Sequence, residues 1–375
     1  MAGVYKITGT TTETTRILVI KESDWSVESN TVVSGSGAFE ITTLSGSKVV
    51  TGITGGDKSL SWAGVAPSYV IPPGEEWTLR TTGVGAGNWE GVCWSPGLSL
   101  FCAVAGYASS GDKAMISSDG ITWEQQDDAP AGNFWTSVCW SPEEEIFVAV
   151  GDSGSDRTMS SPDGITWTQH APETDSGWQS VCWSPELSLF CAVATDAVMT
   201  SASGTTWTDR TSADNRAWNA VCWSPELELF CAVANSGNST NQVMTSSSGI
   251  DWDHRDSPAG NFNDVCWSPE LSLFCAVGGS NEQKVITSPD GINWTGRTPA
   301  ADIFWMSVCW ASEASLFCAV ATTGTGNRVM TSSDGINWDI QTSAADYVWN
   351  EVCWSPSLTM FAAVSQQVGS VMTSG

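Results

Sequence analysis

The triplet Val-Cys-Trp occurs seven times in this chain of 375 residues, from Val92–Trp94 to Val352–Trp354. Successive copies begin 40 to 46 residues apart. A repeat of this length that contains four short strands is typical of a β-propeller blade. The seven copies therefore predict seven blades. We expect the blades to pack into a ring, because no single repeat buries its apolar faces alone.

Each repeat contains four segments with the composition of β-strands. In one copy these begin with "WQSVCW" (residues 178–183), the turn "SPELS" and "LFCAV" (189–193). A third segment, "AVMTS" (197–201), and a fourth of the type "ITWTQ" (165–169) complete the pattern. The segments are rich in Val, Trp, Phe and Thr, are separated by Gly, Pro, Asp and Ser, and show no helical period. The sequence predicts four-stranded antiparallel blades.

The chain ends after the third segment of the seventh repeat, in "SVMTSG". The missing fourth segment precedes the first repeat, where "GEEWTLRTTG" (Gly74–Gly83) matches "GINWDIQTSA" (Gly335–Ala344). We therefore expect the strand around Trp77 to complete the last blade beside Val371–Thr373. Joining both ends of the ring in one sheet removes two exposed edges.

Residues 1–70 lack the repeat and read as short strands separated by Gly and Ser, which predicts a small β-sandwich. The segment "SGSGAFEITTLSGSKVVTGITGG" (34–56) resembles carboxypeptidase-regulatory-like domains of transthyretin type. Residues 71–75 are the expected linker, in a Pro-rich stretch, and the propeller is expected over residues 76–375.

Ser-x-Asp-Gly-x-x-Trp, or a variant with Pro before Asp, recurs between the third and fourth segments. In two repeats Ser203 and Ser248 replace the Asp. The pattern resembles the Asp-box of sialidase-like propellers, although it is one residue shorter. That resemblance implies a structural turn, in which the carboxylate holds backbone amides and the Trp packs between strands. The four acidic positions are Asp119, Asp163, Asp290 and Asp334.

The sequence offers few catalytic candidates. A sialidase needs an arginine cluster and a Tyr nucleophile, but Arg80, Arg210, Arg255 and Arg297 are equivalent repeat positions. His170 and His254 are the only histidines, and neither a Gly-x-Ser-x-Gly motif nor a phosphate-binding loop occurs. We therefore expect no enzyme, no cofactor and no metal site, with a glycoside hydrolase of sialidase-like type as one alternative.

All twelve cysteines occupy repeat positions, and no Cys-x-x-Cys occurs. In a hairpin centred on the "SPELS" turn, the two cysteines of one repeat face each other across neighbouring strands. They form either disulfides or pairs of buried free thiols, and the residues do not decide between these states. The candidate pairs are Cys93–Cys102, Cys182–Cys191, Cys222–Cys231, Cys266–Cys275 and Cys309–Cys318.

The chain carries 41 acidic and 14 basic residues, a net charge of −27. Such a charge repels nucleic acids and anionic membranes, so we expect neither partner. No apolar run reaches the roughly 18 residues of a membrane span. The first residues, "MAGVYKITGTTTETT", lack the pattern of a secretory signal peptide. We expect an extracellular or virion-associated protein without such a signal.

Alternating strand direction places the "SPELS" and Ser-x-Asp-Gly turns on one face of the ring, here called the uniform face. The other connections differ between repeats and share the opposite, variable face. Rigid scaffolds commonly bind through such loops. The candidate binding residues on the variable face are Tyr107, Phe134, Asn235, Asn238 and Tyr347.

The blades "W-x-x-V-C-W-S-P-E-L-x-L-F" behind a small β-domain resemble propellers of tailed-phage tail fibres and environmental surface appendages. The resemblance implies a binding or display role, with a cell-surface or glycan receptor on the variable face. Other virion or appendage proteins, or copies of the chain, are expected to contact residues 1–70. The main alternative is a structural subunit of an extracellular filament.

Overall fold

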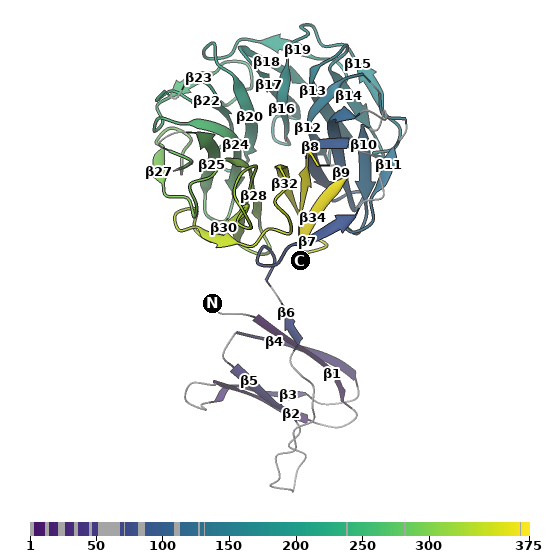
Figure 1. Cartoon of the computed structure of the whole chain (residues 1–375), viewed down its shortest axis with the longest axis vertical. Coiled ribbons are helices and arrows are strands. Elements are labelled where there is room, and N and C mark those ends of the chain that lie inside the picture. Colours follow the sequence, from purple (N-terminus) through teal and green to yellow (C-terminus); the bar gives the residue numbers. More distant parts are fainter. Residues whose placement is uncertain are drawn as a thin grey trace, which may run out of the picture. The chain divides into compact units, whose positions relative to one another are not determined.

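The computed structural model confirms an all-β chain in which seven four-stranded antiparallel sheets surround a central axis (Figure 1). The residues described are 4–11, 15–21, 27–33, 37–44, 47–51, 68–70, 72–81, 87–108, 113–126, 128–130, 132–237, 239–280, 283–367 and 369–375. They form two compact units, Met1–Pro72 and Pro73–Gly375. None of these residues belongs to a helix long and apolar enough to cross a bilayer.

The first unit contains two three-stranded antiparallel sheets, in the orders β4-β1-β6 and β3-β2-β5 (Figure 1). Its strands are β1 (Val4–Thr11), β2 (Thr15–Lys21), β3 (Val27–Val33), β4 (Gly37–Leu44), β5 (Ser47–Thr51) and β6 (Ser68–Val70).

The first strand of each blade lies nearest the axis, and the fourth lies at the rim. The innermost strands are β8 (Gly87–Ser95), β12 (Phe134–Ser141), β16 (Trp178–Ser184), β20 (Trp218–Ser224), β24 (Asn261–Ser268), β28 (Trp305–Ala311) and β32 (Trp349–Ser355). The second strands are β9 (Leu100–Ala108), β13 (Ile146–Ser153), β17 (Leu189–Ala194), β21 (Leu229–Ala234), β25 (Leu273–Ser280), β29 (Leu316–Ala321) and β33 (Met360–Ser365).

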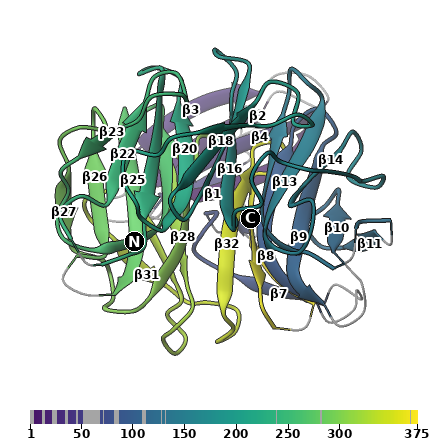
Figure 2. The same ribbon diagram turned by 90° about the horizontal axis from the view of Figure 1, so that it is seen from above.

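The third strands are β10 (Ala114–Ser117), β14 (Thr158–Ser161), β18 (Ala197–Ser201), β22 (Val243–Ser246), β26 (Val285–Ser288), β30 (Val329–Ser332) and β34 (Ser370–Ser374). The rim strands are β11 (Glu124–Gln126), β15 (Thr168–His170), β19 (Thr208–Arg210), β23 (Asp253–Arg255), β27 (Thr295–Arg297), β31 (Asp339–Gln341) and β7 (Thr78–Thr81). Figure 2 shows the blades edge-on, with their connections at the two ends of the strands.

The second strand is apolar without alternation because both of its faces are covered by neighbouring blades. In β17, Phe190, Cys191, Ala192 and Val193 are all fully buried. A strand covered on both sides reads as a continuous hydrophobic run, as "LFCAV" does. The core is therefore a series of clusters between adjacent blades rather than one central mass.

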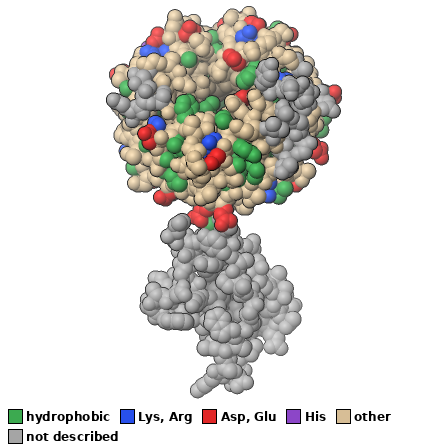
Figure 3. All heavy atoms as spheres, in the orientation of Figure 1, with side chains coloured by type: hydrophobic (Ala, Val, Ile, Leu, Met, Phe, Trp, Pro, Cys, Tyr) green, Lys and Arg blue, Asp and Glu red, His purple; other side chains and the backbone are tan. Residues whose placement is uncertain are grey.

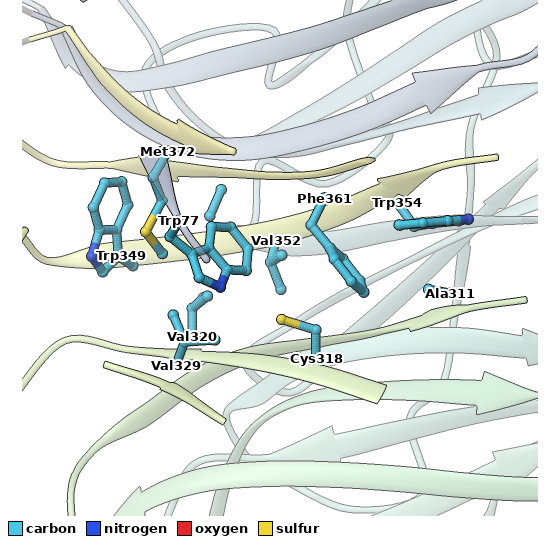
Figure 4. Packing of buried hydrophobic residues seen from close by; sticks show 11 residues of the cluster. Trp77, Ala311, Cys318, Val320, Val329, Trp349, Val352, Trp354, Phe361 and Met372 are labelled. Atoms are coloured by element: carbon cyan, nitrogen blue, oxygen red, sulfur yellow. The ribbon is translucent and has the colours of Figure 1, made fainter. Parts of the chain in front are cut away.

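The seventh blade closes as expected, because β34 pairs with β7 and Met372 lies opposite Leu79. The turn that joins third and fourth strands in the other blades is here divided between two distant parts of the chain. Gly74 N donates to Ser374 Oγ at 2.7 Å, and Trp77 Nε1 donates to Gly74 O at 3.0 Å. Figure 4 shows Trp77 beside Met372 and Trp349. Burial of Trp77 therefore closes the ring.

Candidate functional site

A channel runs along the propeller axis and is lined by the innermost strands. Each of these strands contains a bulge between the first aromatic residue and Val of its W-x-x-V segment, as between Trp178 and Ser180. The two residues of the bulge line the channel, with Gly91 as the exception. A bulge re-aims side chains at the edge of a sheet.

We name the two rings of bulge residues by their depth from the variable face. The mouth ring is Glu90, Thr136, Gln179, Asn219, Asn263, Met306 and Asn350. The floor ring is Gly91, Ser137, Ser180, Ala220, Asp264, Ser307 and Glu351. Together with Phe134 they enclose a cavity of about 140 Å³ that opens on the variable face. A second cavity, of about 440 Å³, lies beyond the floor ring toward the uniform face.

Both rings supply hydrogen-bond partners to the backbone of the innermost strands, whose unpaired edges face the channel. Floor-ring oxygens accept the Val N–H of the next blade, as Ser180 Oγ does from Val221 at 3.2 Å. Mouth-ring donors bind carbonyls of the next blade, as Thr136 Oγ1 does with Trp178 O at 2.8 Å. Buried backbone groups need such partners, so most residues of these rings hold neighbouring blades together.

Two floor positions carry carboxylates where serine suffices elsewhere. Asp264 accepts N–H groups from Val265 and Val308, both at 2.8 Å, and Glu351 Oε2 accepts from Val92 N at 2.6 Å. Burial raises the pKa of Asp264 to about 6 despite these bonds. Burial, together with the negative charge of Asp264, raises the pKa of Glu351 well above its ordinary value.

Small neighbours in the ring make room for these two acids. A Cβ atom on Gly91 would lie 3.2 Å from Glu351 Oε2 and 3.0 Å from the Ser137 Cα. On the other side, Ala220 offers no oxygen to the next blade, and the Asp264 carboxylate accepts the Val265 N–H in its place. Gly91 therefore leaves space for Glu351, and Asp264 replaces the acceptor that Ala220 lacks.

A third carboxylate and an amide extend this acidic side to the mouth. Burial raises the pKa of Glu90 to about 7, against a smaller lowering by its hydrogen bond with Gln366. Asn350 Nδ2 donates to Trp89 O at 2.9 Å and to Glu90 Oε2 at 2.8 Å. Asn350 Oδ1 is buried and has no donor. The site therefore contains more acceptors than donors, and carboxyl groups able to exchange protons near neutral pH.

The residues predicted to bind a ligand are only partly at this site. Phe134 lines the cavity, and Asn235 Nδ2 donates to Asn263 Oδ1 at the mouth, at 2.6 Å. Tyr347 packs on Trp349, with ring centroids 5.9 Å apart. The Tyr107 side chain and Asn238 lie outside the described residues. Tyr347 is thus half-buried against the cluster between blades 6 and 7.

The predicted turn residues lie on the exposed uniform face. Asp290 Oδ1 accepts N–H groups from Ile292 at 2.9 Å and Asn293 at 2.7 Å, while Trp294 Nε1 donates to Gly291 O at 3.0 Å. Asp119, Asp163 and Asp334 make equivalent contacts. Ser203 and Ser248, which replace Asp in two blades, hold the turn through longer bonds.

The cysteine pairs have the expected register, with Cys182 directly opposite Cys191 and the other four pairs alike. All twelve cysteines are free thiols in the structure. Burial raises the pKa of every one, so the neutral thiol is the stable form. The two alternatives drawn from the sequence, disulfides and pairs of buried free thiols, both stay predictions. No group of three or more His, Cys, Asp or Glu in the described ranges is arranged to hold a metal.

Sequence reasoning missed the channel carboxylates. It located variation in the loops, although the two residues between the first aromatic residue and Val also differ in every repeat. Asp264 and Glu351 are the acidic exceptions at a position otherwise occupied by Gly, Ala or Ser. A comparison of the repeats position by position would have found them.

Figure 3 shows acidic and basic side chains scattered over one face of the molecule rather than gathered in one charged patch. The surface charge visible there marks no particular region as a site. The buried carboxylates of the channel are the more distinctive feature.

No protein-family model and no curated protein matches the chain. Solved structures match its fold. A streptogramin B lyase has a TM-score of 0.67 at 7% identity, covering 80% of this chain and 97% of the lyase. Virginiamycin B lyase from Staphylococcus aureus has a TM-score of 0.65 at 8% identity, covering 80% and 100%. YCF48 bound to a D1 peptide has a TM-score of 0.60 at 14% identity, covering 80% and 96%.

These similarities show the propeller fold and correct one expectation. The sequence led us to expect no enzyme. That exclusion of an enzymatic activity is wrong, because two lyases share the fold. The missing motifs exclude particular catalytic families only, since one fold hosts many functions. A binding role is compatible with the same fold, because another neighbour binds a peptide.

Proposed function

We propose that this protein is the receptor-contacting module of a phage tail fibre or a cell-surface appendage, and that it binds through the variable face. The observation that carries the proposal is the position of the acceptor-rich channel mouth. Glu90, Asn350 and Phe134 line a cavity on the same face as the loops that differ between repeats. A concave site with a few convergent polar groups is the usual form of a binding site.

The connectivity of the propeller unit supports this choice of face. The hydrogen bond between Gly74 N and Ser374 Oγ places both ends of the unit in one turn of the uniform face. Neither Gly74 nor Ser374 therefore lies on the variable face.

The chemistry of the mouth favours a protein receptor over the glycan expected from the sequence. Amide side chains such as Gln179 and Asn219 suit both sugar hydroxyls and peptide groups. The buried acceptors, Asn350 Oδ1 among them, and the carboxyl groups favour a ligand that brings both donors and positive charge, and a neutral glycan has hydroxyl donors but no positive charge. The chain's net charge of −27 also attracts a basic partner.

The proposal is tested by shortening one variable loop. Blade 3 joins Ala194 to Ala197 through a two-residue turn, whereas blade 4 uses residues 235–241 before Gln242 at the equivalent position. We would replace residues 235–241 with Thr-Asp and measure binding of the labelled protein to a panel of bacterial cells by flow cytometry. The matched control is Ile165→Ser, which changes an exposed side chain on the uniform face, at the opposite end of the strands from the channel mouth.

We expect the shortened loop to reduce binding at least tenfold and Ile165→Ser to leave it unchanged. Loss in Ile165→Ser alone would place the contact on the uniform face, and equal loss in both variants would show no preference for the variable face; either result would contradict the proposal. Polymers of the unmodified protein in electron micrographs, without cell binding, would favour the filament alternative.

A further inference from the structure

The acceptors of the channel are concentrated on one side of the ring. Blades 5, 6, 7 and 1 contribute Asp264, Ser307, Glu351, Asn350 and Glu90, whereas the rings of blades 2 to 4 are uncharged. We propose that this side of the channel mouth receives the ammonium group of a lysine side chain from the receptor. The inference rests on the proposed binding role of the variable face.

Among the residues that the structure describes, no salt bridge involves Glu90, Asp264 or Glu351. None of the residues that line the mouth cavity is Lys, Arg or His. Buried carboxylates are ordinarily paired, because removing an unpaired charge from water is costly. Three carboxyl groups with raised pKa values therefore face a cavity whose lining supplies backbone, amide and hydroxyl donors but no cationic side chain.

Asn350 is a second, independent indication of a missing donor. Both partners of its Nδ2 atom, Trp89 O and Glu90 Oε2, are acceptors, so the amide orientation is fixed by the hydrogen bonds. Its Oδ1 atom has no donor, although the side chain is only 5% exposed. An unmade bond to a buried acceptor is costly, and a ligand N–H group would remove that cost.

The geometry favours an ammonium group over a metal ion. Both oxygens of Asp264 and one of Glu351 already accept backbone N–H groups, and the two residues are separated by Ser307 in the ring. No three ligating side chains in the described part of the chain converge on one point. An ammonium group has three N–H donors that point in different directions, so it can serve acceptors spread along a wall.

The cavity also suits the stem of a lysine. Phe134 and Met306 line the mouth beside the polar residues and provide apolar contact for methylene groups. Lysine commonly buries its stem while its charged end reaches a polar partner. The volume of about 140 Å³ accommodates an ammonium group and part of its stem.

The test uses n-butylammonium as the probe and the full chain as the protein. Binding is followed by NMR through the amides of Val92 and Val308, which donate to Glu351 and Asp264. Tetramethylammonium carries the same charge without N–H donors, n-butylguanidinium offers a planar group, and Ca²⁺ represents a metal. The variant Glu351→Gln keeps an acceptor for Val92, and Glu145→Gln on an exposed turn is the matched control.

We expect saturable shifts of both amides with n-butylammonium, at least tenfold weaker binding in Glu351→Gln, and unchanged binding in Glu145→Gln. Tetramethylammonium should bind at least tenfold more weakly. A similar response to tetramethylammonium, tighter binding of Ca²⁺ or of n-butylguanidinium, or no response to n-butylammonium would overturn the proposal. The unmodified protein gives these readings even where Glu351→Gln does not fold.

Failure of this inference is distinguishable from failure of the proposed function. If shortening the loop abolishes cell binding while n-butylammonium gives no amide shifts, the receptor binds the variable face without the ammonium contact. If shortening the loop leaves cell binding unchanged, the proposed function fails, whatever the amide shifts show.

Discussion

A hydrogen bond between neighbouring blades occurs five times around the ring and is missing at the other two positions. We predict that restoring a missing bond stabilises the protein. The Glu of a "SPE" or "ASE" turn accepts the indole N–H of the next Val-Cys-Trp motif, as Glu186 Oε2 does from Trp223 at 2.6 Å. Gly97 and Ser357 stand where the other turns have Glu. The corresponding indole nitrogens, of Trp140 and Trp94, are buried without partners.

Gly97→Glu should restore the bond to Trp140. A Cβ atom at Gly97 would lie 3.5 Å from Trp140 Cζ2, an ordinary contact, and the backbone there does not require glycine. A hydrogen bond to a charged group contributes about 1.5–3 kcal/mol. Ordering the Glu side chain costs roughly 1.5–2 kcal/mol, and loss of glycine freedom in the unfolded chain returns about 0.4–1 kcal/mol. We expect a net gain of about 1 kcal/mol in the free energy of unfolding.

The assay is urea denaturation followed by tryptophan fluorescence, with scanning calorimetry as a second measure. Gly97→Ala isolates the backbone contribution, and Trp140→Phe removes the donor. The reasoning is refuted if Gly97→Glu stabilises no more than Gly97→Ala does, or if the gain persists in the Trp140→Phe background. The reverse change, Glu186→Ala, should destabilise by a similar amount because it leaves Trp223 without its partner.

Three further predictions concern the closure of the ring by Trp77, the buried carboxyl groups of the channel and the cysteine thiols. Trp77→Ala should lower the free energy of unfolding by about 3–5 kcal/mol, and Trp77→Phe by less, because the ring closes on this buried side chain; chemical denaturation measures both. The pKa of Asp264 is raised to about 6 in the folded state, so the stability that its protonation contributes is present below pH 4 and is lost as pH rises through about 6. The pKa of Glu351 is raised as well, so its contribution is likewise lost as pH rises. For Asp264 this loss is on the order of 2–3 kcal/mol, and Glu351→Gln should flatten the pH dependence of urea unfolding. Thiol titration in denaturant without reductant should find twelve free groups, as in the structure, whereas two would show five disulfides.

The architecture followed from the repeat because each blade obeys the same local rules. The interval between Val-Cys-Trp motifs gave the number of blades, and the match between residues 74–83 and 335–344 gave the closing strand. Turn residues such as Pro185 and Gly204 marked the hairpin ends. These features depend on short-range chemistry and on burial of both strand faces, which the sequence shows directly.

The channel did not follow, since its character depends on side chains brought together from seven distant segments. A bulge in each innermost strand turns two consecutive residues toward the axis, and nothing local in "WNEV" or "FNDV" distinguishes this from regular alternation. The pairing of Glu351 with Gly91 spans 260 residues and depends on ring closure. The role of Glu186 was likewise hidden, because its partner Trp223 belongs to the next blade.

Photo-crosslinking on intact cells tests most directly whether the channel mouth is the binding site. Benzoylphenylalanine would replace Gln179 in the mouth ring or Leu187 in an exposed turn of the uniform face. We predict a covalent adduct with a cell-surface protein from position 179 and none from position 187. An adduct from position 187 alone would contradict the account.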